Sequence, residues 1–215
     1  MITDKKICYI YGAMPLTSKP MIPEEKDLII AADKGYETLK KIGLEPAFAV
    51  GDFDSLEFVP TDTEIILHPV EKDDTDMSLA VNEGIKRGFD TFVIYGGMGG
   101  RPDHTYANIQ LAADMAKKGI KVFFIGEGYT VTALYESEIL FDKKAKGNIS
   151  VFSVTDSSKG VYEQGLKYSL SDAVLTNTVP LGVSNEFMGT ESRVSVKKGI
   201  LLVMFEGEDI SVVKD

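Results

Sequence analysis

The feature that most constrains the fold is a change of hydrophobic pattern near residue 126. Before it, short apolar runs alternate with segments of helical spacing. After it come only short runs of β-forming residues, separated by turn signals such as Lys146-Gly147-Asn148. Strands that alternate with helices predict a parallel sheet wrapped by helices, whereas closely spaced strands predict antiparallel pairing. We therefore expect an α/β domain over residues 1–127 and a smaller antiparallel all-β domain over residues 128–215.

The expected elements follow from the apolar runs and from the residues that end them. The strands of the first domain are expected at 7–11, 28–32, 48–50, 64–67, 91–95 and 120–125. Its helices are expected at 35–42, from a cap at Asp74 or Thr75 to Gly88, and from Pro102 to Gly119. The second domain is expected to hold strands at 130–134, 138–141, 149–154, 160–162, 173–175 and 194–203.

Composition indicates a folded protein and limits its binding partners and its cellular compartment. Of 215 residues, 44% are hydrophobic, which is enough to fill a sizeable core. The net charge of −10 argues against nucleic acid or an anionic membrane as partner, because both attract basic surfaces. Cys8 is the single cysteine, which excludes a disulfide within the chain and fits a reducing compartment. The first apolar run is too short for a signal peptide, so a cytoplasmic location is expected.

Polar and glycine residues come directly after several of the expected strands. These residues are Asp33, Asp52, Asp54, Gly96, Gly97 and Arg101. In open parallel sheets, ligands bind beyond the carboxyl ends of the strands. We therefore expect these residues to share one edge of the sheet.

Two acidic motifs suggest a site for a hard cation. Asp52 and Asp54 are two residues apart, so in an extended chain both face the same way, with Cα atoms about 6.6 Å apart. Short carboxylates at that spacing can converge on Mg²⁺, although a solvated turn is the alternative. In Lys72-Asp73-Asp74-Thr75-Asp76, helix capping explains one or two of the acidic residues, but three repel one another without a cation. Lys72 could offset part of this charge or meet a phosphate.

A glycine-rich motif suggests phosphate. The glycines at 96, 97, 99 and 100 allow backbone amides to approach a phosphate closely, but they also suit a flexible turn, and the motif is not a Walker A loop. Arg101 can grip a phosphate through two nitrogens, or form a surface ion pair. His104 and Asn108 lie one helical turn apart on one face, which could line the cleft or face solvent.

The motifs in this order resemble the thiamine pyrophosphokinase family over nearly the whole chain. The resemblance rests on Ala32-Asp33-Lys34-Gly35, Gly51-Asp52-Phe53-Asp54-Ser55, Lys72-Asp73-Asp74-Thr75-Asp76, Gly100-Arg101-Pro102-Asp103-His104 with Asn108, and Gly182-Val183-Ser184-Asn185-Glu186. It implies an α/β domain followed by a β domain, in a homodimer with sites at the subunit interface. It also implies transfer of a pyrophosphoryl group from ATP to the hydroxyl of thiamine, giving thiamine diphosphate and AMP.

The same resemblance implies roles for individual residues. Asp52, Asp54 and Asp76 would hold Mg²⁺, and Arg101 and Lys72 would meet phosphate. Asp73, Thr75, Asp103, His104 and Asn108 would position ATP or the hydroxyl, and Asp33 and Gly97 are also expected to bind substrate. Ser184 and Asn185 would face thiamine. Asp103 is the candidate general base.

The chain departs from the family pattern in its divergent β-domain segments and in having no tryptophan to stack on the thiamine ring, so that an aromatic such as Phe187 would have to substitute. Two other classes of function remain open from the residues alone. One is another magnesium-dependent nucleotide phosphohydrolase, and the other is a non-catalytic nucleotide sensor.

Overall fold

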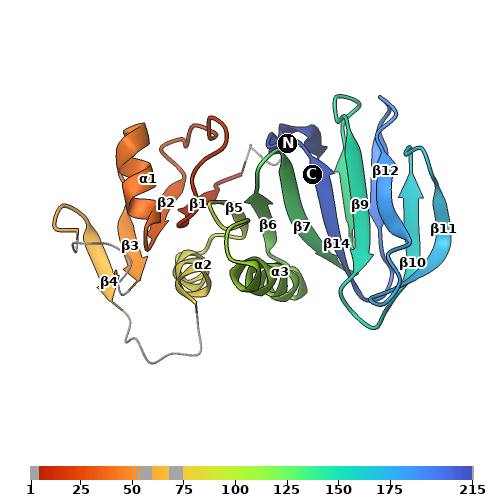
Figure 1. Cartoon of the computed structure of the whole chain (residues 1–215), viewed down its shortest axis with the longest axis horizontal. Helices are drawn as coiled ribbons and strands as arrows, with labels where there is room; N and C mark the ends of the chain where they lie inside the picture. Colours follow the sequence, from red (N-terminus) through yellow and green to blue (C-terminus); the bar gives the residue numbers. More distant parts are fainter. Residues whose placement is uncertain (1–4, 52, 54–59, 68–74, 215) are drawn as a thin grey trace. The chain divides into compact units, whose positions relative to one another are not determined.

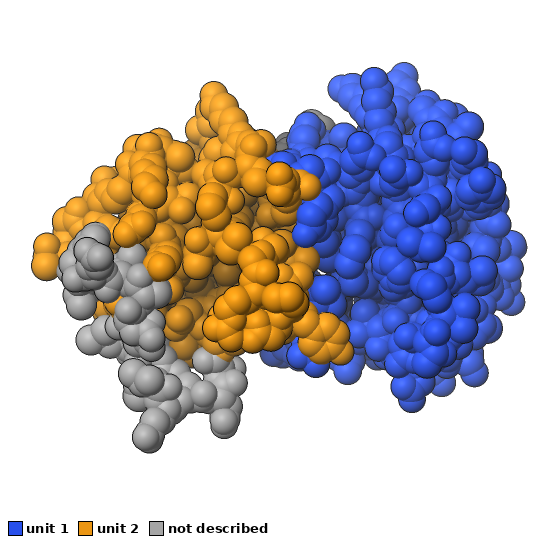
Figure 2. Space-filling model, viewed as in Figure 1, with its two compact units in different colours: residues 1–5, 109–123, 128–215 blue, residues 6–108, 124–127 orange. Residues whose placement is uncertain are grey.

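The computed structural model describes residues 5–51, 53, 60–67 and 75–214, which form two compact units (Figure 1, Figure 2). The first unit comprises residues 6–108 and 124–127, and the second is built chiefly from 109–123 and 128–215. The first has the α/β pattern with parallel strands, and the second is dominated by antiparallel strands. The expected fold class is therefore confirmed.

The α/β unit contains a parallel sheet in the strand order β5-β1-β2-β3-β4. Its strands are β1 (Cys8–Tyr11), β2 (Leu28–Ala32), β3 (Phe48–Gly51), β4 (Glu64–Leu67) and β5 (Thr91–Tyr95), and β6 (Lys121–Ile125) follows α3 in sequence. Its helices are α1 (Gly35–Ile42), α2 (Asp76–Lys86) and the start of α3 (Pro102–Lys117). Helix α1 packs on β1 and β2, and α2 packs on β1, β2 and β3.

Local sequence explains where these helices begin and end. A Cβ atom at Gly35 would lie 1.7 Å from the backbone oxygen of Tyr11, so only glycine allows α1 to start this close to β1. Gly43 ends α1 in the left-handed region, and its amide donates to Leu39 and Lys40. Thr75 caps α2, because its hydroxyl oxygen accepts a hydrogen bond of 3.2 Å from the amide of Ser78.

The second unit contains two antiparallel sheet portions. One has the order β12-β9-β14-β7, and the other has the order β11-β10-β13-β8-β15. The strands are β7 (Tyr129–Tyr135), β8 (Glu138–Phe141), β9 (Asn148–Ser153), β10 (Ser157–Gln164), β11 (Leu170–Thr176), β12 (Gly182–Glu186), β13 (Ser192–Ser195), β14 (Ile200–Glu206) and β15 (Val213–Lys214), with a short 3₁₀ helix, η2 (Ile210–Val212).

The core of this unit is aromatic, with one buried polar link. Phe141 packs edge-on against Phe187 and Phe205, with ring centroids 5.0 and 5.1 Å apart. Beside them Asn185 of β12 donates a hydrogen bond of 2.7 Å to the carboxylate of Glu163 in β10. Burial raises the pKa of Glu163, and this hydrogen bond opposes the rise. A polar pair therefore connects a strand of one sheet portion to a strand of the other.

The structure differs from the expected elements at three places. Strands β12 and β15 were not expected, because Gly182–Glu186 lacks an apolar alternation and β15 is only two residues long. The expected run 194–203 is two strands, since Gly199 has a φ of +105° and turns the chain between them. Phe187, named above as an example of an aromatic that would have to take the place of a tryptophan, is buried in the core.

None of the helices within the described residues is long and apolar enough to cross a membrane.

Candidate functional site

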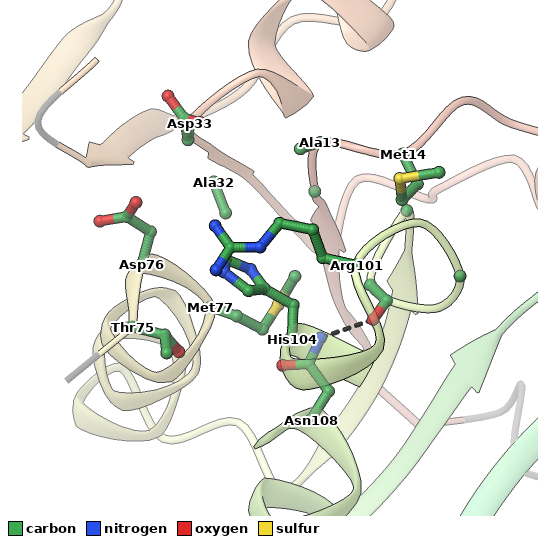
Figure 3. Close-up of a pocket in the computed structure, with 14 residues that line it drawn as sticks. Ala13, Met14, Ala32, Asp33, Thr75, Asp76, Met77, Arg101, His104 and Asn108 are labelled. Carbon is green, nitrogen blue, oxygen red and sulfur yellow. Dashed lines mark hydrogen bonds between the residues drawn. The ribbon is translucent and has the colours of Figure 1, made fainter. Parts of the chain in front are cut away.

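A cavity of about 230 Å³ opens at the carboxyl edge of the parallel sheet, within the α/β unit. Three strand ends and two helix starts contribute to it (Figure 3). The residues lining it include Gly12, Ala13, Met14, Ala32, Asp33, Thr75, Asp76, Gly96, Gly97, Arg101, His104 and Asn108. The structure thus brings together the sequence-predicted residues Asp33, Thr75, Asp76, Gly97, Arg101, His104 and Asn108.

Backbone hydrogen bonds hold the strand-end loops around this cavity. The amide of Gly12 donates to the oxygen of Tyr95 at 2.7 Å, and that of Met14 donates to Gly96 at 3.1 Å. A Cβ atom at Gly12 would lie 2.7 Å from the oxygen of Gly96, so the two loops approach as closely as backbone permits. The loop after β1 and the glycine-rich loop after β5 therefore lie against each other and together line one side of the cavity.

The start of α2 and the start of α3 both lie at the cavity. Thr75 and Asp76 open α2, and Arg101 directly precedes α3. The first amides of a helix have no partner within the helix and carry the positive end of its dipole. Two such ends at one cavity favour a polyanion such as a triphosphate.

Two described carboxylates line the same cavity: Asp33, which directly follows β2, and Asp76, the first residue of α2 (Figure 3). Asp33 has a φ of +47°, the left-handed conformation that aspartate tolerates better than most residues. Within residues 5–51, 53, 60–67 and 75–214, no three histidine, cysteine, aspartate or glutamate side chains form a metal-binding group. Asp52, Asp54, Lys72 and Asp73 lie outside the described residues.

Among the described residues that line the cavity, Arg101 carries a positive charge, and it is paired with Asp103. Its Nε and Nη2 atoms donate to the two carboxylate oxygens at 3.2 and 2.6 Å. The pair lowers the pKa of Asp103, so that this carboxylate is a weak proton acceptor while it is held by Arg101. Both side chains are largely exposed, so the pair adds little to stability and can exchange partners easily.

Asn108 holds the glycine-rich loop in place through a hydrogen bond. It is buried on α3, and its Nδ2 atom donates a hydrogen bond of 2.5 Å to the oxygen of Gly97 (Figure 3). His104, one turn earlier, is exposed and lines the cavity. On this face of α3, Asn108 therefore supports the glycine-rich loop, and His104 lines the cavity.

The sequence motifs did not predict that the loop after β1 belongs to the site. Ala13 and Met14 line the cavity, yet neither carries a charged or reactive group that would mark it in the sequence. The available signal is positional, since Gly12 follows an expected parallel strand in the same way as Asp33 and Gly96 do.

The remaining two candidates, Ser184 and Asn185, belong to the β unit. Ser184 is exposed with a φ of +59°. Asn185 is 4% exposed, and both ends of its amide are bonded to protein groups. The side-chain amide of Asn185 therefore makes its hydrogen bonds within the protein in this arrangement.

Comparison with known proteins gives one consistent result. Residues 21–124 match the family profile "Thiamin pyrophosphokinase, catalytic domain", and residues 136–201 match "Thiamin pyrophosphokinase, vitamin B1 binding domain". A protein from Bacillus subtilis (strain 168) named thiamine pyrophosphokinase is 31% identical over 190 residues, which cover 84% of this chain and 88% of that protein.

Solved structures agree with the sequence relatives. The crystal structure of thiamine pyrophosphokinase from Bacillus subtilis has a TM-score of 0.82 at 28% identity, covering 95% of this chain and 100% of that chain. Thiamin pyrophosphokinase from Candida albicans has a TM-score of 0.74 at 16% identity, with 95% and 90% covered, and this likeness shows the fold alone. From the sequence relative and the matched profiles, the chain belongs to the thiamine pyrophosphokinase family.

Proposed function

We propose that this protein is a thiamine pyrophosphokinase that converts ATP and thiamine to thiamine diphosphate and AMP. The observation that carries the proposal is the cavity, most of whose lining residues lie in the segment 21–124 that matches the catalytic-domain profile. It combines two carboxylates, an arginine and two helix N-termini at the carboxyl edge of a parallel sheet. We assign ATP to residues 1–127 and the thiamine pocket to residues 128–215, which the second matched profile supports.

The reaction needs positioning and charge neutralisation more than covalent chemistry by the protein. The thiamine hydroxyl oxygen bonds to the β-phosphorus, the bond between this phosphorus and the oxygen bridging to the α-phosphorus breaks, and AMP leaves. The hydroxyl proton passes to a base. We propose that amides at the start of α2 and α3, together with Arg101, bind the phosphate oxygens.

The donor set at the cavity fits Mg²⁺. Asp33 and Asp76 supply carboxylate oxygens, which hard cations prefer, and the one cysteine, Cys8, is buried in β1. We propose that Asp76 holds the ion together with Asp52 and Asp54. When bound, the ion neutralises charge on the phosphates and so lets an acidic protein accept a polyphosphate.

The ion pair of Arg101 with Asp103 suggests how substrate binding prepares a base. We propose that Arg101 leaves Asp103 when it binds the polyphosphate. Losing this partner raises the pKa of Asp103 back toward the ordinary range, which makes it a better acceptor for the hydroxyl proton. Lys72 and Asp73 are proposed to assist at the phosphates, and Thr75 and His104 to position ATP.

We further propose a cytoplasmic homodimer in which the α/β domain of one subunit and the β domain of the other build each site, with no nucleic acid or membrane as partner. Mixing Asp76→Asn subunits with Asn185→Ala subunits tests this arrangement. At a thiamine concentration too low for the Asn185→Ala dimers to turn over, hybrid dimers should show part of the activity, because one of their two sites has no substitution. Hybrid dimers that are verified by mass but remain inactive would argue that each site is built within one chain.

Product analysis tests the proposed function. The protein is incubated with ATP, Mg²⁺ and thiamine, and the nucleotides and thiamine phosphates are separated and measured. Equal amounts of AMP and thiamine diphosphate are expected. ADP or free phosphate without thiamine diphosphate would indicate a phosphohydrolase, and unchanged ATP would indicate a sensor.

A further inference from the structure

One buried carboxyl group has no part in the proposed reaction. Glu163 lies on β10 of the β unit and is 1% exposed. Its Oε2 atom accepts one hydrogen bond, of 2.7 Å, from the Nδ2 atom of Asn185. Its Oε1 atom is also buried and has no hydrogen-bond partner among the residues that the structure describes. An ionised carboxyl group has sites for about four hydrogen bonds, so most of these sites on Glu163 are unused.

The strands beside Glu163 place apolar residues next to it. Its partners in the two ladders are Leu170 of β11 and Val194 of β13, and Val194 is fully buried. Side chains alternate along a strand, so the neighbouring Tyr162 and Gln164 point to the opposite face of β10. The carboxyl group of Glu163 therefore faces the core of the β unit.

The charged groups of the surrounding segments are exposed and paired with one another. The pairs are Lys167 with Glu186, Arg193 with Glu138, and Lys197 with Asp172. Each of these side chains is 45% exposed or more, and the ring of Tyr168 in the turn after β10 is also exposed. Among the described residues, no charged group therefore compensates a negative charge on Glu163, and burial and the hydrogen bond from Asn185 act on its pKa.

A neutral carboxyl group suits this position better than a carboxylate. Moving an ionised carboxyl group out of water is costly unless cations or several donors compensate, and here one neutral amide does so. Burial raises the pKa of Glu163, and the hydrogen bond from Asn185 offsets only part of this rise. The folded β unit therefore binds a proton at Glu163 that the unfolded chain releases more readily.

Glu163 and Asn185 together form a buried link between segments of the β unit. The Oδ1 atom of Asn185 accepts from the amides of Tyr168 and Glu186, each at 2.9 Å. Its Nδ2 atom donates to the oxygen of Tyr168 at 2.6 Å as well as to Glu163. The buried link thus ties β10 to β12 and to the turn that follows β10. A change that destabilises it should loosen these segments together.

We propose that the buried link is a pH-sensitive contact, in which Glu163 is protonated in the folded β unit and its ionisation at higher pH loosens β12 and the turn after β10. The direction of the effect follows from proton linkage. Because the folded protein holds this proton more tightly than the unfolded chain, its contribution to stability is complete below the ordinary glutamate pKa of about 4.3. This contribution is lost as the pH rises from there through the raised pKa of the folded protein. The proposal concerns the folding of the β unit and does not rest on the proposed function.

Urea unfolding, followed by circular dichroism from about pH 4.5 to 8.5, tests the proposal with Glu163→Gln, which keeps an acceptor oxygen for Asn185 but cannot ionise. Relative to this variant, the unfolding equilibrium constant of the unsubstituted protein should rise with pH, by up to about tenfold per pH unit, since one proton is involved. Hydrogen exchange of the Tyr168 and Glu186 amides should also become faster with pH, relative to the same amides in the variant. A ratio of the two proteins that stays constant with pH in either measurement would overturn the proposal.

Glu191→Gln is the matched control, because Glu191 is an exposed glutamate of the same unit that pairs with Lys214. It removes the same charge from the surface and should keep the pH dependence of the unsubstituted protein. If Glu163→Gln does not fold, magnetic resonance titration of the side-chain carboxyl carbons in the unsubstituted protein decides the question. The Glu163 signal should titrate above the ordinary glutamate range, and a midpoint within or below that range would overturn the proposal. Neither ATP nor thiamine enters these measurements, so their outcome is independent of the proposed function.

Discussion

Asp76→Asn is expected to lower turnover at least about a hundredfold without unfolding the protein, which is the size of effect seen when one group that stabilises transition-state charge is removed. Asp76 opens α2 and lines the cavity, so it lies where the charge of a polyphosphate has to be balanced. The same loss is expected for Asp52→Asn and Asp54→Asn. The measurement is kcat at saturating Mg²⁺, together with a thermal unfolding curve.

The matched control for these variants is Asp114→Asn, an exposed aspartate of α3 that pairs with Lys118. It removes the same charge from a helix surface and should leave turnover unchanged. Near-normal turnover in two of the three site variants would remove the basis for a metal site at this edge of the sheet.

Arg101→Ala should lower kcat/KM for ATP about 10- to 150-fold and affect thiamine much less, since a hydrogen bond to a charged group is worth about 1.5–3 kcal/mol. The guanidinium already binds a carboxylate through two nitrogens, which is the geometry it would use on phosphate oxygens. Arg101→Lys should recover only part of the loss, because an ammonium group cannot reproduce the two-nitrogen contact.

Arg193→Ala provides the comparison, because Arg193 is an exposed arginine of β13 that pairs with Glu138. Its removal should change neither substrate's kinetics. A loss of thiamine affinity in Arg101→Ala with ATP affinity retained would mean that Arg101 serves the acceptor.

The α/β unit could be predicted well from the sequence because its strands are buried on both faces. Such strands appear as short continuous apolar runs, and their ends are marked by glycine or aspartate, as at Tyr11 and Ala32. The gathering of Asp33, Gly97 and Arg101 at one cavity follows from the same fact. Once strands are parallel, the residues after them share one edge.

Other parts of the site depend on contacts that a sequence pattern does not reveal. Ala13 and Met14 line the cavity through their backbone position, and nothing in their side chains marks them. Phe187 lies among polar residues in the sequence, and only the packing of the β unit shows that its ring is buried. The amide of Asn185 looks available in the sequence, but in the fold its hydrogen bonds are made within the protein.

The transfer of both phosphates as one unit is the central claim, and position-labelled ATP tests it most directly. The protein is incubated with Mg²⁺, thiamine and ATP labelled at either the β- or the γ-phosphorus. Both labels should appear in thiamine diphosphate, in amounts equal to the AMP released, and AMP should carry neither. Retention of the β label in ADP, with the γ label in free phosphate or in thiamine monophosphate, would contradict pyrophosphoryl transfer.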